Sequence, residues 1–336
     1  MSQEPTARVG PWRARDLAEI RTDVGALDEP GRWVVAVGFE GAVVACRFDT
    51  WERDGSELGD GWAGVPVESW KSSATREVFC AGVEDIRERI ARGDVYQVNL
   101  CRVLRAPFPE HGDIATLDAL LVRHNPAQHG GFVRVPGLEL ACASPELFLR
   151  REDDHLVSGP IKGTARPGES MLDKDVAENV MITDLVRNDL SRVATVGSVR
   201  VPELLHEESH PGLVHLVSYV HADVAGSTTW SAVLAASFPP GSVTGAPKHT
   251  ALQAIGELES SPRAFYCGAF GWVDGETGNG SLAVTIRTFW RDGKDLCFGT
   301  GAGITWGSDP VREWEETELK ARHLLSVAAM TDEATR

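Results

Sequence analysis

Residues 282–289 read Leu-Ala-Val-Thr-Ile-Arg-Thr-Phe, and this stretch is the clearest strand signal in the chain. Successive side chains of a β-strand point to opposite faces of a sheet, so alternation assigns every second residue to one face. One face would carry Leu282, Val284, Ile286 and Thr288, and the other Ala283, Thr285, Arg287 and Phe289. Burying Arg287 is costly unless a carboxylate meets it, which makes Arg287 a candidate ligand-binding residue.

Other strand patterns surround this stretch and dominate the chain. They predict a hairpin across 32–48 and strands within 131–158, 214–224 and 265–273, with an irregular segment at 50–72. Helical spacing predicts helices over 77–92, 174–190 and 309–328, the last capped by Ser308 or Asp309 with Pro310 in its first turn. Because strands follow one another without regular βαβ units, we predict the α+β class. No repeat or linker divides the sequence, so one domain is expected.

The composition excludes several classes of partner. The chain has 336 residues, a formal net charge of −16 and a pI of about 5.1, which argues against nucleic acid and anionic membranes. Its six cysteines form no C-x-x-C pair and lie mostly in apolar runs, which predicts reduced thiols in a cytoplasmic protein. No run approaches the length of a membrane span, and the N-terminus has no apolar signal core.

One lysine stands in an unusual setting. The segment Pro160-Ile161-Lys162-Gly163-Thr164 predicts a tight turn around it. An amine that is shielded from water, or close to a metal cation, has a lowered pKa and can act as a nucleophile. Glu146, in Ser144-Pro145-Glu146, is the expected carboxylate partner. The alternative is an ordinary exposed loop lysine, as most lysines are.

Three glutamates suggest a metal site. Glu313, Glu316 and Lys320 share one face of the last predicted helix, with Val311 and Leu325 expected on the opposite side. Glu178 adds a third carboxylate from another predicted helix. Carboxylates without His or Cys favour Mg²⁺ over zinc. The alternative is a solvated ion pair between Glu316 and Lys320.

Two glycine-rich segments and one histidine complete the candidates. Residues 299–305 read Gly-Thr-Gly-Ala-Gly-Ile-Thr, which predicts a turn whose backbone could approach an anion. Residues 240–248 predict a ligand-facing loop or a tight connector. His215 lies on an apolar strand, where a lone histidine is more often a core residue than a functional one.

In this order, the segments resemble the chorismate-utilising enzymes, and within them most closely the aminodeoxychorismate synthase component I group (para-aminobenzoate synthase large subunit). The resemblance covers residues 76–328 and rests on the motifs at 93–99, 144–146, 160–164, 184–190, 242–248, 299–305 and 313–320, together with Arg287. It implies an anthranilate-synthase-like fold of two large, packed, mainly antiparallel sheets flanked by helices. It also implies a shortened N-terminal segment at 1–75 packed on the same core, a catalytic domain at 76–330 and a flexible tail at 331–336.

The resemblance assigns roles to individual residues. Lys162, Glu146 and His215 would be catalytic, and Glu178, Glu313 and Glu316 would hold Mg²⁺. Chorismate would be bound by Gln97, Thr244, Ala246, Tyr266, Arg287, Gly301, Gly303 and Lys320. The Leu-Leu-Glu-Ser segment of the tryptophan site in relatives is missing, so tryptophan binding is not expected.

Two positions distinguish reactions within the resembled family. Gln97 replaces the lysine that deprotonates water in ring-hydroxylating members, and an amide cannot act as that base. Lys162 replaces the small residue of anthranilate synthases. The resemblance implies that its amine adds at C2 of chorismate, that ammonia then adds at C4, and that Glu146 acts as acid and later as base.

The implied product is 4-amino-4-deoxychorismate, for p-aminobenzoate and folate or a secondary metabolite. The resemblance implies that ammonia comes from a separate class I glutamine amidotransferase, because Cys267 lacks the glycine-flanked nucleophile turn of such enzymes. Two alternatives remain: anthranilate synthase component I, which aminates C2, and a non-catalytic subunit that binds an amidotransferase.

Overall fold

The computed structural model describes residues 4–53, 61–165, 168–171, 173–210 and 213–331. Its α-helices are α1 (Arg76–Arg92), α2 (Ile114–His124), α3 (Asp173–Ser191), α4 (Trp230–Ser237), α5 (Lys248–Leu258) and α6 (Pro310–Ala328). Short 3-10 helices are η1 (Val24–Asp28), η2 (Val67–Ser69) and η3 (Gly241–Val243). The first nine strands are β1 (Thr6–Val9), β2 (Trp12–Arg21), β3 (Arg32–Val37), β4 (Val43–Arg53), β5 (Lys71–Ser72), β6 (Gln97–Pro107), β7 (Gly131–Val135), β8 (Leu138–Cys142) and β9 (Leu147–Glu152). The others are β10 (His155–Gly159), β11 (Ile161–Ala165), β12 (Arg200–His210), β13 (Leu213–Asp223), β14 (Gly245–Ala246), β15 (Ala269–Asp274), β16 (Gly280–Val284), β17 (Thr288–Asp292) and β18 (Asp295–Ile304).

Antiparallel ladders join the described strands into one network. Neighbouring strands follow the order β5–β6–β18–β17–β8–β7–β1–β2–β4–β3–β15–β16–β9–β10–β13, with β11 and β12 on β13 and β14 on β6. The predicted α+β class is therefore confirmed, and hydrogen bonds connect what we expected as two sheets.

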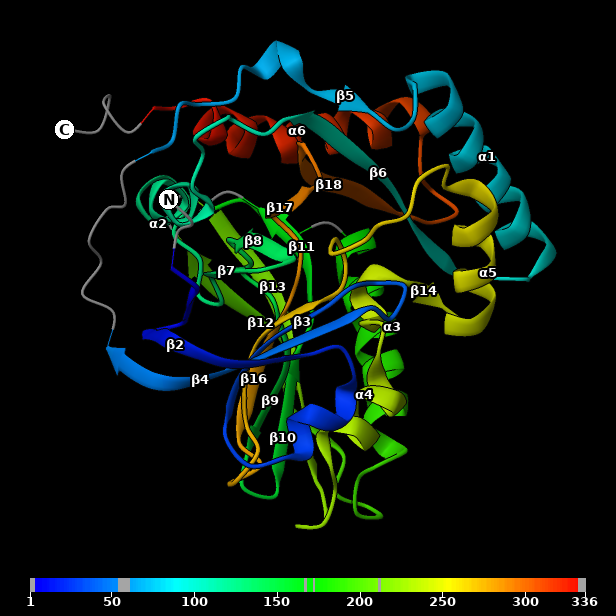
Figure 1. The fold of residues 1–336 in the computed structure, drawn as a ribbon. Coiled ribbons are helices and arrows are strands. Elements are labelled where there is room, and N and C mark those ends of the chain that lie inside the picture. The colour runs from blue at the N-terminus through cyan, green and yellow to red at the C-terminus, as the bar shows by residue number, and fades with distance from the viewer. Residues whose placement is uncertain (1–3, 54–60, 166–167, 172, 211–212, 332–336) are drawn as a thin grey trace.

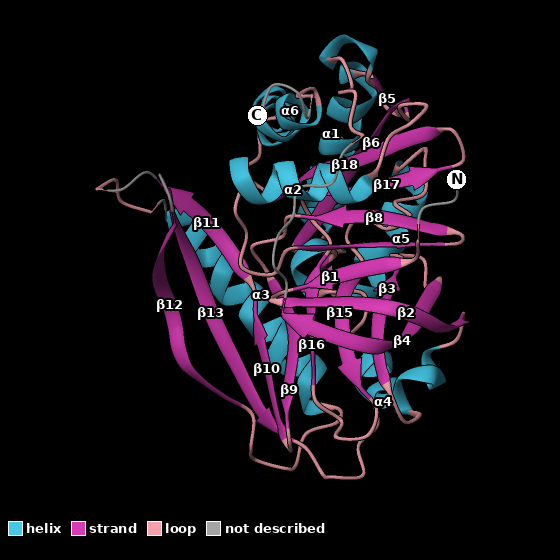
Figure 2. Cartoon of the chain, turned by 60° about the vertical axis from the view of Figure 1, so that its left-hand side comes forward, coloured by secondary structure: helices cyan, strands magenta, loops and turns pink. Residues whose placement is uncertain are grey.

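The helices cover this network from several sides. At the top of Figure 1, α1 and α6 pack against each other and against β6 and β18, with α5 beside β6. Figure 2 shows α3 lying along the splayed strands β11, β12 and β13, on which it packs. The helices predicted at 77–92, 174–190 and 309–328 are confirmed as α1, α3 and α6. The predicted hairpin at 32–48 is confirmed as β3 and β4.

The stretch 282–289 is not one strand, so this prediction is wrong. It divides into β16 and β17, because Arg287 adopts a left-handed backbone conformation with φ of 53°. β16 pairs with β9, whereas β17 pairs with β8. The β8–β9 connection breaks at the same level, and the two crossing segments bond through Ala143 N to Arg287 O (3.0 Å) and Val284 N to Glu146 O (3.0 Å). The crossing therefore brings Arg287 and Glu146 into one region.

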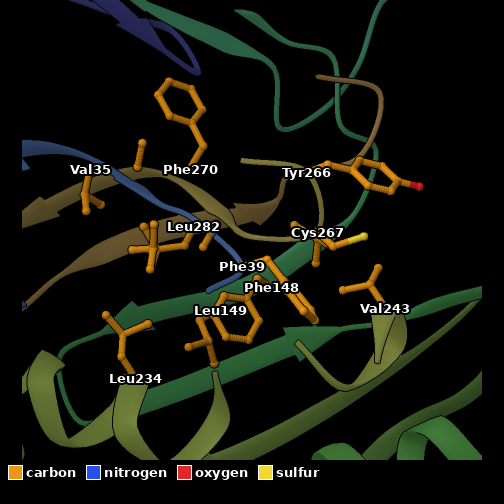
Figure 3. Close-up of a cluster of buried hydrophobic side chains, with 14 of the residues drawn as sticks. Val35, Phe39, Phe148, Leu149, Leu234, Val243, Tyr266, Cys267, Phe270 and Leu282 are labelled. Carbon is orange, nitrogen blue, oxygen red and sulfur yellow. The ribbon is translucent and has the colours of Figure 1, made fainter. Parts of the chain in front are cut away.

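Apolar side chains fill the space below this crossing. Figure 3 shows Phe148, Leu149, Leu234 and Leu282 converging from β9, α4 and β16. Phe148 also meets Phe238 edge to face, with ring centroids 6.1 Å apart. Such close packing makes the core rigid, and the crossing segments are attached directly to it.

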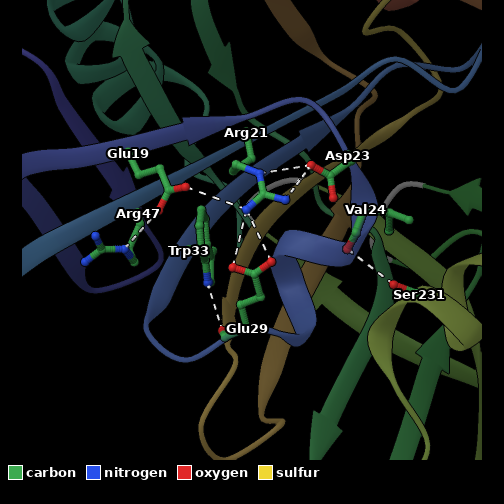
Figure 4. A network of polar contacts seen from close by, with 8 residues as sticks. All are labelled: Glu19, Arg21, Asp23, Val24, Glu29, Trp33, Arg47 and Ser231. Atoms are coloured by element: carbon green, nitrogen blue, oxygen red, sulfur yellow. Dashed lines mark hydrogen bonds and ion pairs between the residues drawn. The ribbon is translucent and has the colours of Figure 1, made fainter.

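A polar network fastens the N-terminal strands. Arg21 bonds Asp23 (3.0 Å) and Glu29 (3.2 Å), and the Trp33 indole donates to the Glu29 carbonyl oxygen (3.2 Å; Figure 4). In the same view, Ser231 of α4 donates to the Val24 carbonyl oxygen. β1 pairs with β7 and β3 with β15, so β1 to β4 belong to the same strand network as the other strands.

Several smaller predictions can be compared with the structure. All six cysteines are free thiols, and Cys80 is the one that is not fully buried. The strand predicted at 265–273 begins only at Ala269, because the preceding residues turn and Cys267 has φ of 64°. Within the described ranges, no helix has the length and apolar character needed to cross a membrane. Most of the tail predicted at 331–336 lies outside the described residues.

Candidate active site

Lys162 lies in a strand, and the predicted turn is wrong. It belongs to β11, which pairs with β13 and contains a register shift between Ile161 and Thr164. Gly163, with φ of 93°, provides the backbone conformation of this irregularity. The Lys162 side chain is only 13% exposed, and its Nζ lies 2.7 Å from Glu178 Oε1. The alternative of an exposed loop lysine is therefore also wrong.

Glu178 is the point where four elements meet. Its Oε1 accepts a hydrogen bond from Gln97 Nε2 of β6 as well as the ion pair from Lys162. Gly303 of β18 lies so close that an added Cβ would be 2.6 Å from Glu178 Oε1 and 3.5 Å from Lys162 Nζ. A glycine is needed at Gly303 because the side chains from α3, β6 and β11 occupy the space in front of it.

The charge environment of Lys162 opposes our prediction. Burial alone lowers the pKa of its amine, but the carboxylates of Glu178, Glu146 and Glu316 raise it, and the net pKa lies above the ordinary value. The prediction of a lowered pKa is therefore wrong for the chain by itself. The reason is that three negative charges outweigh the loss of hydration.

Glu146 is buried and carries an unusual pKa. It is 4% exposed, and burial raises the pKa of its carboxyl to about 7 against the opposing effects of Ser242, Lys162 and Arg287. Burial in turn lowers the pKa of Arg287, although Glu146 acts in the other direction. A carboxyl with a pKa near neutrality can both donate and accept a proton under ordinary conditions. Glu146 is therefore close enough to Arg287 for their charges to interact.

The carboxylates of Glu313 and Glu316 lie in the first two turns of α6. Asp309 caps the helix by accepting from Arg312 N (2.9 Å), as predicted. Burial raises the pKa of Glu313, as does its neighbour Glu316. For Glu316, the effect of Lys320, Lys174 and Lys162 exceeds that of burial and lowers the pKa.

The rest of the α6 surface agrees only in part with the prediction. Val311 is 41% exposed, so it does not lie on the buried face, which instead carries Ala321, Leu324 and Leu325. Lys320 Nζ forms the expected ion pair with Glu316 Oε1 (2.7 Å), and both side chains are substantially exposed. The alternative of a solvated pair is therefore partly right. Lys320 nevertheless also donates to the Gly301 carbonyl oxygen (3.2 Å), which connects α6 to β18.

The glycine-rich segment 299–305 is mainly a strand, not the predicted turn. It forms the end of β18, and its partner along one edge is β6. β17 pairs with β18 only as far as Phe298, so the other edge has no partner among the described strands from Gly299 to Ile304. Apart from the Gly301 carbonyl oxygen, which Lys320 binds, backbone groups on this edge are available to a ligand. Added Cβ atoms would overlap the Tyr266 ring at Gly299 and lie 2.6 Å from Cys101 Sγ at Gly301.

The other predicted residues surround this region. His215 is buried on β13, with Thr164 of β11 and Glu208 of β12 as its cross-strand neighbours. Ala246 of β14 pairs with Gln97. The Thr244 hydroxyl donates to the carbonyl oxygens of Pro240 (3.2 Å) and Gly241 (3.1 Å).

Thr244 and Tyr266 therefore have structural contacts of their own. The bonds of Thr244 fix the predicted 240–248 segment as a tight connector. Tyr266 is buried against Gly299.

Sequence reasoning missed two positioning residues. Ser242 acts on Glu146 by lowering the pKa of its carboxyl against the effect of burial. Asn179, buried next to Glu178 on α3, donates to the carbonyl oxygens of Leu216 (2.9 Å) and Lys162 (3.4 Å), which ties α3 to β13 and β11. The sequence did offer one signal for Asn179. Asparagine favours helix caps and turns over helix interiors, so an asparagine inside a helix indicates that its side chain has hydrogen-bond partners.

The predicted metal carboxylates fit Mg²⁺ by their chemistry. In the described ranges no three His, Cys, Asp or Glu side chains are grouped closely enough to hold a metal by themselves. Mg²⁺, however, usually takes one or two carboxylates together with waters and an anionic ligand. Glu313 and Glu316 are close enough to influence each other's charge, and a cation between them would relieve their repulsion.

Comparisons with known proteins show the family of this chain. Residues 57–326 match the chorismate binding enzyme family. The chain is 36% identical over 277 residues to anthranilate synthase component 1 1 of Haloarcula marismortui, covering 78% of this chain and 56% of that protein. It is 36% identical over 271 residues to aminodeoxychorismate synthase component 1 of Escherichia coli, covering 77% and 59%. The chain thus spans less than two thirds of the length of these relatives.

A solved structure confirms the predicted fold. Anthranilate synthase component I from Streptococcus pneumoniae is similar with a TM-score of 0.81 at 21% identity, over 97% of this chain and 93% of that one. The strand network, the buried Lys162–Glu178 pair and the family match over most of the chain lead to one conclusion. This chain belongs to the chorismate binding enzyme family.

Proposed function

We propose that this chain aminates chorismate at C4, with Mg²⁺, to give 4-amino-4-deoxychorismate. The observation that carries the proposal is the buried amine of Lys162 between Glu178, at 2.7 Å, and the neighbouring carboxylate of Glu146. A buried lysine next to an acid with a pKa of about 7 is suited to covalent catalysis with proton transfer.

Chorismate carries two carboxylates, and cationic groups are available for them. Arg287 and Lys320 supply charge, and the unpaired edge of β18 supplies backbone groups at Gly301 and Gly303. Because Arg287 is held by the crossing segments and Lys320 by α6, the substrate would be bound by rigid elements on two sides.

The reaction requires two substitutions. The Lys162 amine forms a bond to C2 while the ring double bond shifts and the C4–oxygen bond breaks. Glu146 gives its proton to the departing hydroxyl, which leaves as water. Ammonia then bonds to C4, the double bond returns, and the C2–nitrogen bond breaks to release Lys162. The proton that ammonia loses is accepted by Glu146, which restores the acid.

Lys162 has to lose its proton before it can attack, and its raised pKa opposes this. Glu313 and Glu316, with Glu178, would hold Mg²⁺. When bound, this ion would supply positive charge that offsets the negative field of the glutamates and so favours the free amine.

Anthranilate synthase is the second candidate function, because the similarity to such enzymes reaches the same 36% identity. Anthranilate synthesis requires space for ammonia next to C2 of chorismate, and in our proposal the Lys162 side chain fills that space. Attack by water is less well supported, because Gln97 has no titratable group and donates its amide to Glu178.

Ammonia would come from a separate class I glutamine amidotransferase. We further propose that the product serves the synthesis of p-aminobenzoate, for folate or for a secondary metabolite. A non-catalytic binding subunit is a weaker proposal, since the lysine and the carboxylates are all retained.

The identity of the product tests the proposal. The purified chain is incubated with chorismate, Mg²⁺ and an ammonium salt, and the product is separated and treated with aminodeoxychorismate lyase. We expect p-aminobenzoate after this treatment. Anthranilate as the sole product would establish the second candidate, and no consumption of chorismate by the metal-loaded protein would support a non-catalytic role.

A further inference from the structure

A small cavity lies beside Glu146. Its lining includes Glu146, Ser158, Asp189, Ser237, Ser242 and Val284. The free space is about that needed for one water-sized molecule. Carboxyl and hydroxyl groups contribute to the lining together with apolar side chains, so the cavity combines enclosure with hydrogen-bonding groups.

One side-chain atom of a lining residue lacks a partner. Glu146 Oε1 is buried and accepts no hydrogen bond from any residue that the structure describes. An unsatisfied buried carboxylate oxygen is costly, and such atoms call for a bound donor. A small molecule with N–H or O–H groups in the cavity would satisfy it.

Two of the lining residues, Asp189 and Ser237, already bind an ammonium group. Lys248 Nζ donates to Asp189 Oδ2 (2.6 Å) and to the carbonyl oxygens of Ser237 (2.8 Å) and Pro239 (2.8 Å). These acceptors are suited to any R–NH₃⁺ or NH₄⁺ group. Asp189 and Lys248 also line an open groove between α3 and the start of α5, together with Tyr96 and Met181. Asp189 therefore belongs to the lining of both the cavity and the groove.

We propose that this cavity is the ammonia site of the enzyme, with Glu146 Oε1 as the acceptor of a hydrogen from the bound ammonia. The inference rests on the proposed amination and adds the place where the nitrogen nucleophile waits. Ammonium enters from the groove past Asp189 and Lys248. In the cavity it gives one proton to the Glu146 carboxylate, which leaves neutral NH₃ and a protonated Glu146. The second proton that Glu146 accepts, when ammonia bonds to C4, is released to solvent before the next ammonium enters.

The charge and the size of the cavity both support this assignment. Asp189 and Glu146 both contribute to the lining, and Asp189 is paired with Lys248, so the unpartnered oxygen of Glu146 is the acceptor left for a bound N–H group. Ammonia is about the size of water, and the enclosing residues Leu147, Phe148 and Val186 leave no room for a larger amine. Transfer of the proton to Glu146 also prepares the acid that the departing hydroxyl needs.

Steady-state kinetics of two cavity variants test the proposal. Val284→Ile adds a methyl group from β16, and Val186→Leu adds one from α3, so both fill the space without removing a polar group. Val133→Ile, on a buried strand residue outside the lining, is the matched control. Rates are measured with ammonium salt as the varied substrate at saturating chorismate and Mg²⁺, and thermal unfolding confirms that each variant is folded.

We expect KM for ammonium to rise about tenfold or more in the two filled variants, as a displaced charge-assisted hydrogen bond would cause. KM for chorismate should stay within about twofold, and the control should resemble the wild type. Unchanged KM for ammonium in folded Val284→Ile and Val186→Leu would overturn the inference and leave a structural water as the occupant. If the wild type consumes no chorismate with ammonium, the proposed function itself fails, which is a different result.

A gain of function provides an independent test. Val284→Ala enlarges the cavity by two methyl groups, so methylamine should fit where the wild type excludes it. We expect an N-methylated product, detected by mass spectrometry, from this variant and none from the wild type. Equal use of methylamine by the wild type and by Val284→Ala would show that the enclosed space does not select the nucleophile.

Discussion

Gly303→Ala is the sharpest test of the site's geometry. The added Cβ would lie 2.6 Å from Glu178 Oε1 and closer still to Gln97 Nε2, so at least one of these groups has to move. Both atoms belong to the hydrogen bond that orients Glu178 toward Lys162. The smallest possible substitution therefore acts directly on the position of the central carboxylate.

The expected magnitude follows from these contacts. Overpacking a filled site costs about 1–3 kcal/mol, and a weakened charge-assisted hydrogen bond costs about 1.5–3 kcal/mol. A displacement of about 1 Å in a catalytic group lowers rates about a hundredfold. We thus expect Gly303→Ala to lose about 2–4 kcal/mol of unfolding free energy, and its kcat to fall about a hundredfold.

Urea unfolding and steady-state rates at saturating chorismate and ammonium measure both effects. Gly256→Ala is the control, because its Cβ would meet nothing within 4 Å on α5, where alanine should stabilise by about 0.5–1 kcal/mol. If Gly303→Ala retains activity within about twofold of Gly256→Ala, the contact between β18 and Glu178 does not control catalysis.

Three further predictions follow from the same structure. Lys162→Ala should abolish C4 amination while chorismate affinity, measured by calorimetry, changes little; normal C4 product would exclude the covalent role. Burial raises the pKa of Glu146 from 4.5 to about 7, so its folded form favours the proton, and stability falls as pH rises through this window. Between pH 4.5 and about pH 7, the unfolding free energy of the wild type should fall by on the order of 3 kcal/mol relative to that of Glu146→Gln, as measured by urea titrations. If the unfolding free energies of the two proteins change with pH in parallel, the burial argument is contradicted. Arg102→Met removes a guanidinium stacked 4.1 Å from the Trp314 ring of α6, and should lower the unfolding free energy by about 2 kcal/mol. The control Arg105→Met removes a more exposed guanidinium and should lower it by less than about 1 kcal/mol. Equal losses in chemical unfolding would refute this role of Arg102.

Local sequence patterns predicted the helices and strands better than they predicted where a strand is interrupted. The helix start at Asp309 and Pro310 was predictable because capping is a local interaction. The division of 282–289 into two strands was not predictable. The positive φ of Arg287 occurs where its carbonyl oxygen accepts a hydrogen bond from Ala143, which is distant in sequence. The glycines of 299–305 looked like a turn, whereas Tyr266, Cys101, Gln97 and Glu178 require them in a strand.

The candidate site shows the same limit. Lys162 and Glu146 could be selected from the sequence because a lysine and a carboxylate stood in segments rich in Pro and Gly. The ionisation of these two residues could not be predicted, because the pKa of each depends on burial and on charges that other elements contribute through space. Ser242 and the cavity behind Glu146 were equally invisible, since they arise only where β9, α3 and the 240–242 segment pack together.

By itself, the sequence determined the alternation of strands, the positions of the main helices and the residue types available for chemistry. These follow from the periodicity of side chains and from local capping, which need no distant contact. Only the tertiary structure decided which strands break, which glycines must stay small and whether Lys162 is charged. Those properties depend on atoms from distant segments meeting within a few ångströms, where steric exclusion and electrostatic fields act regardless of sequence separation.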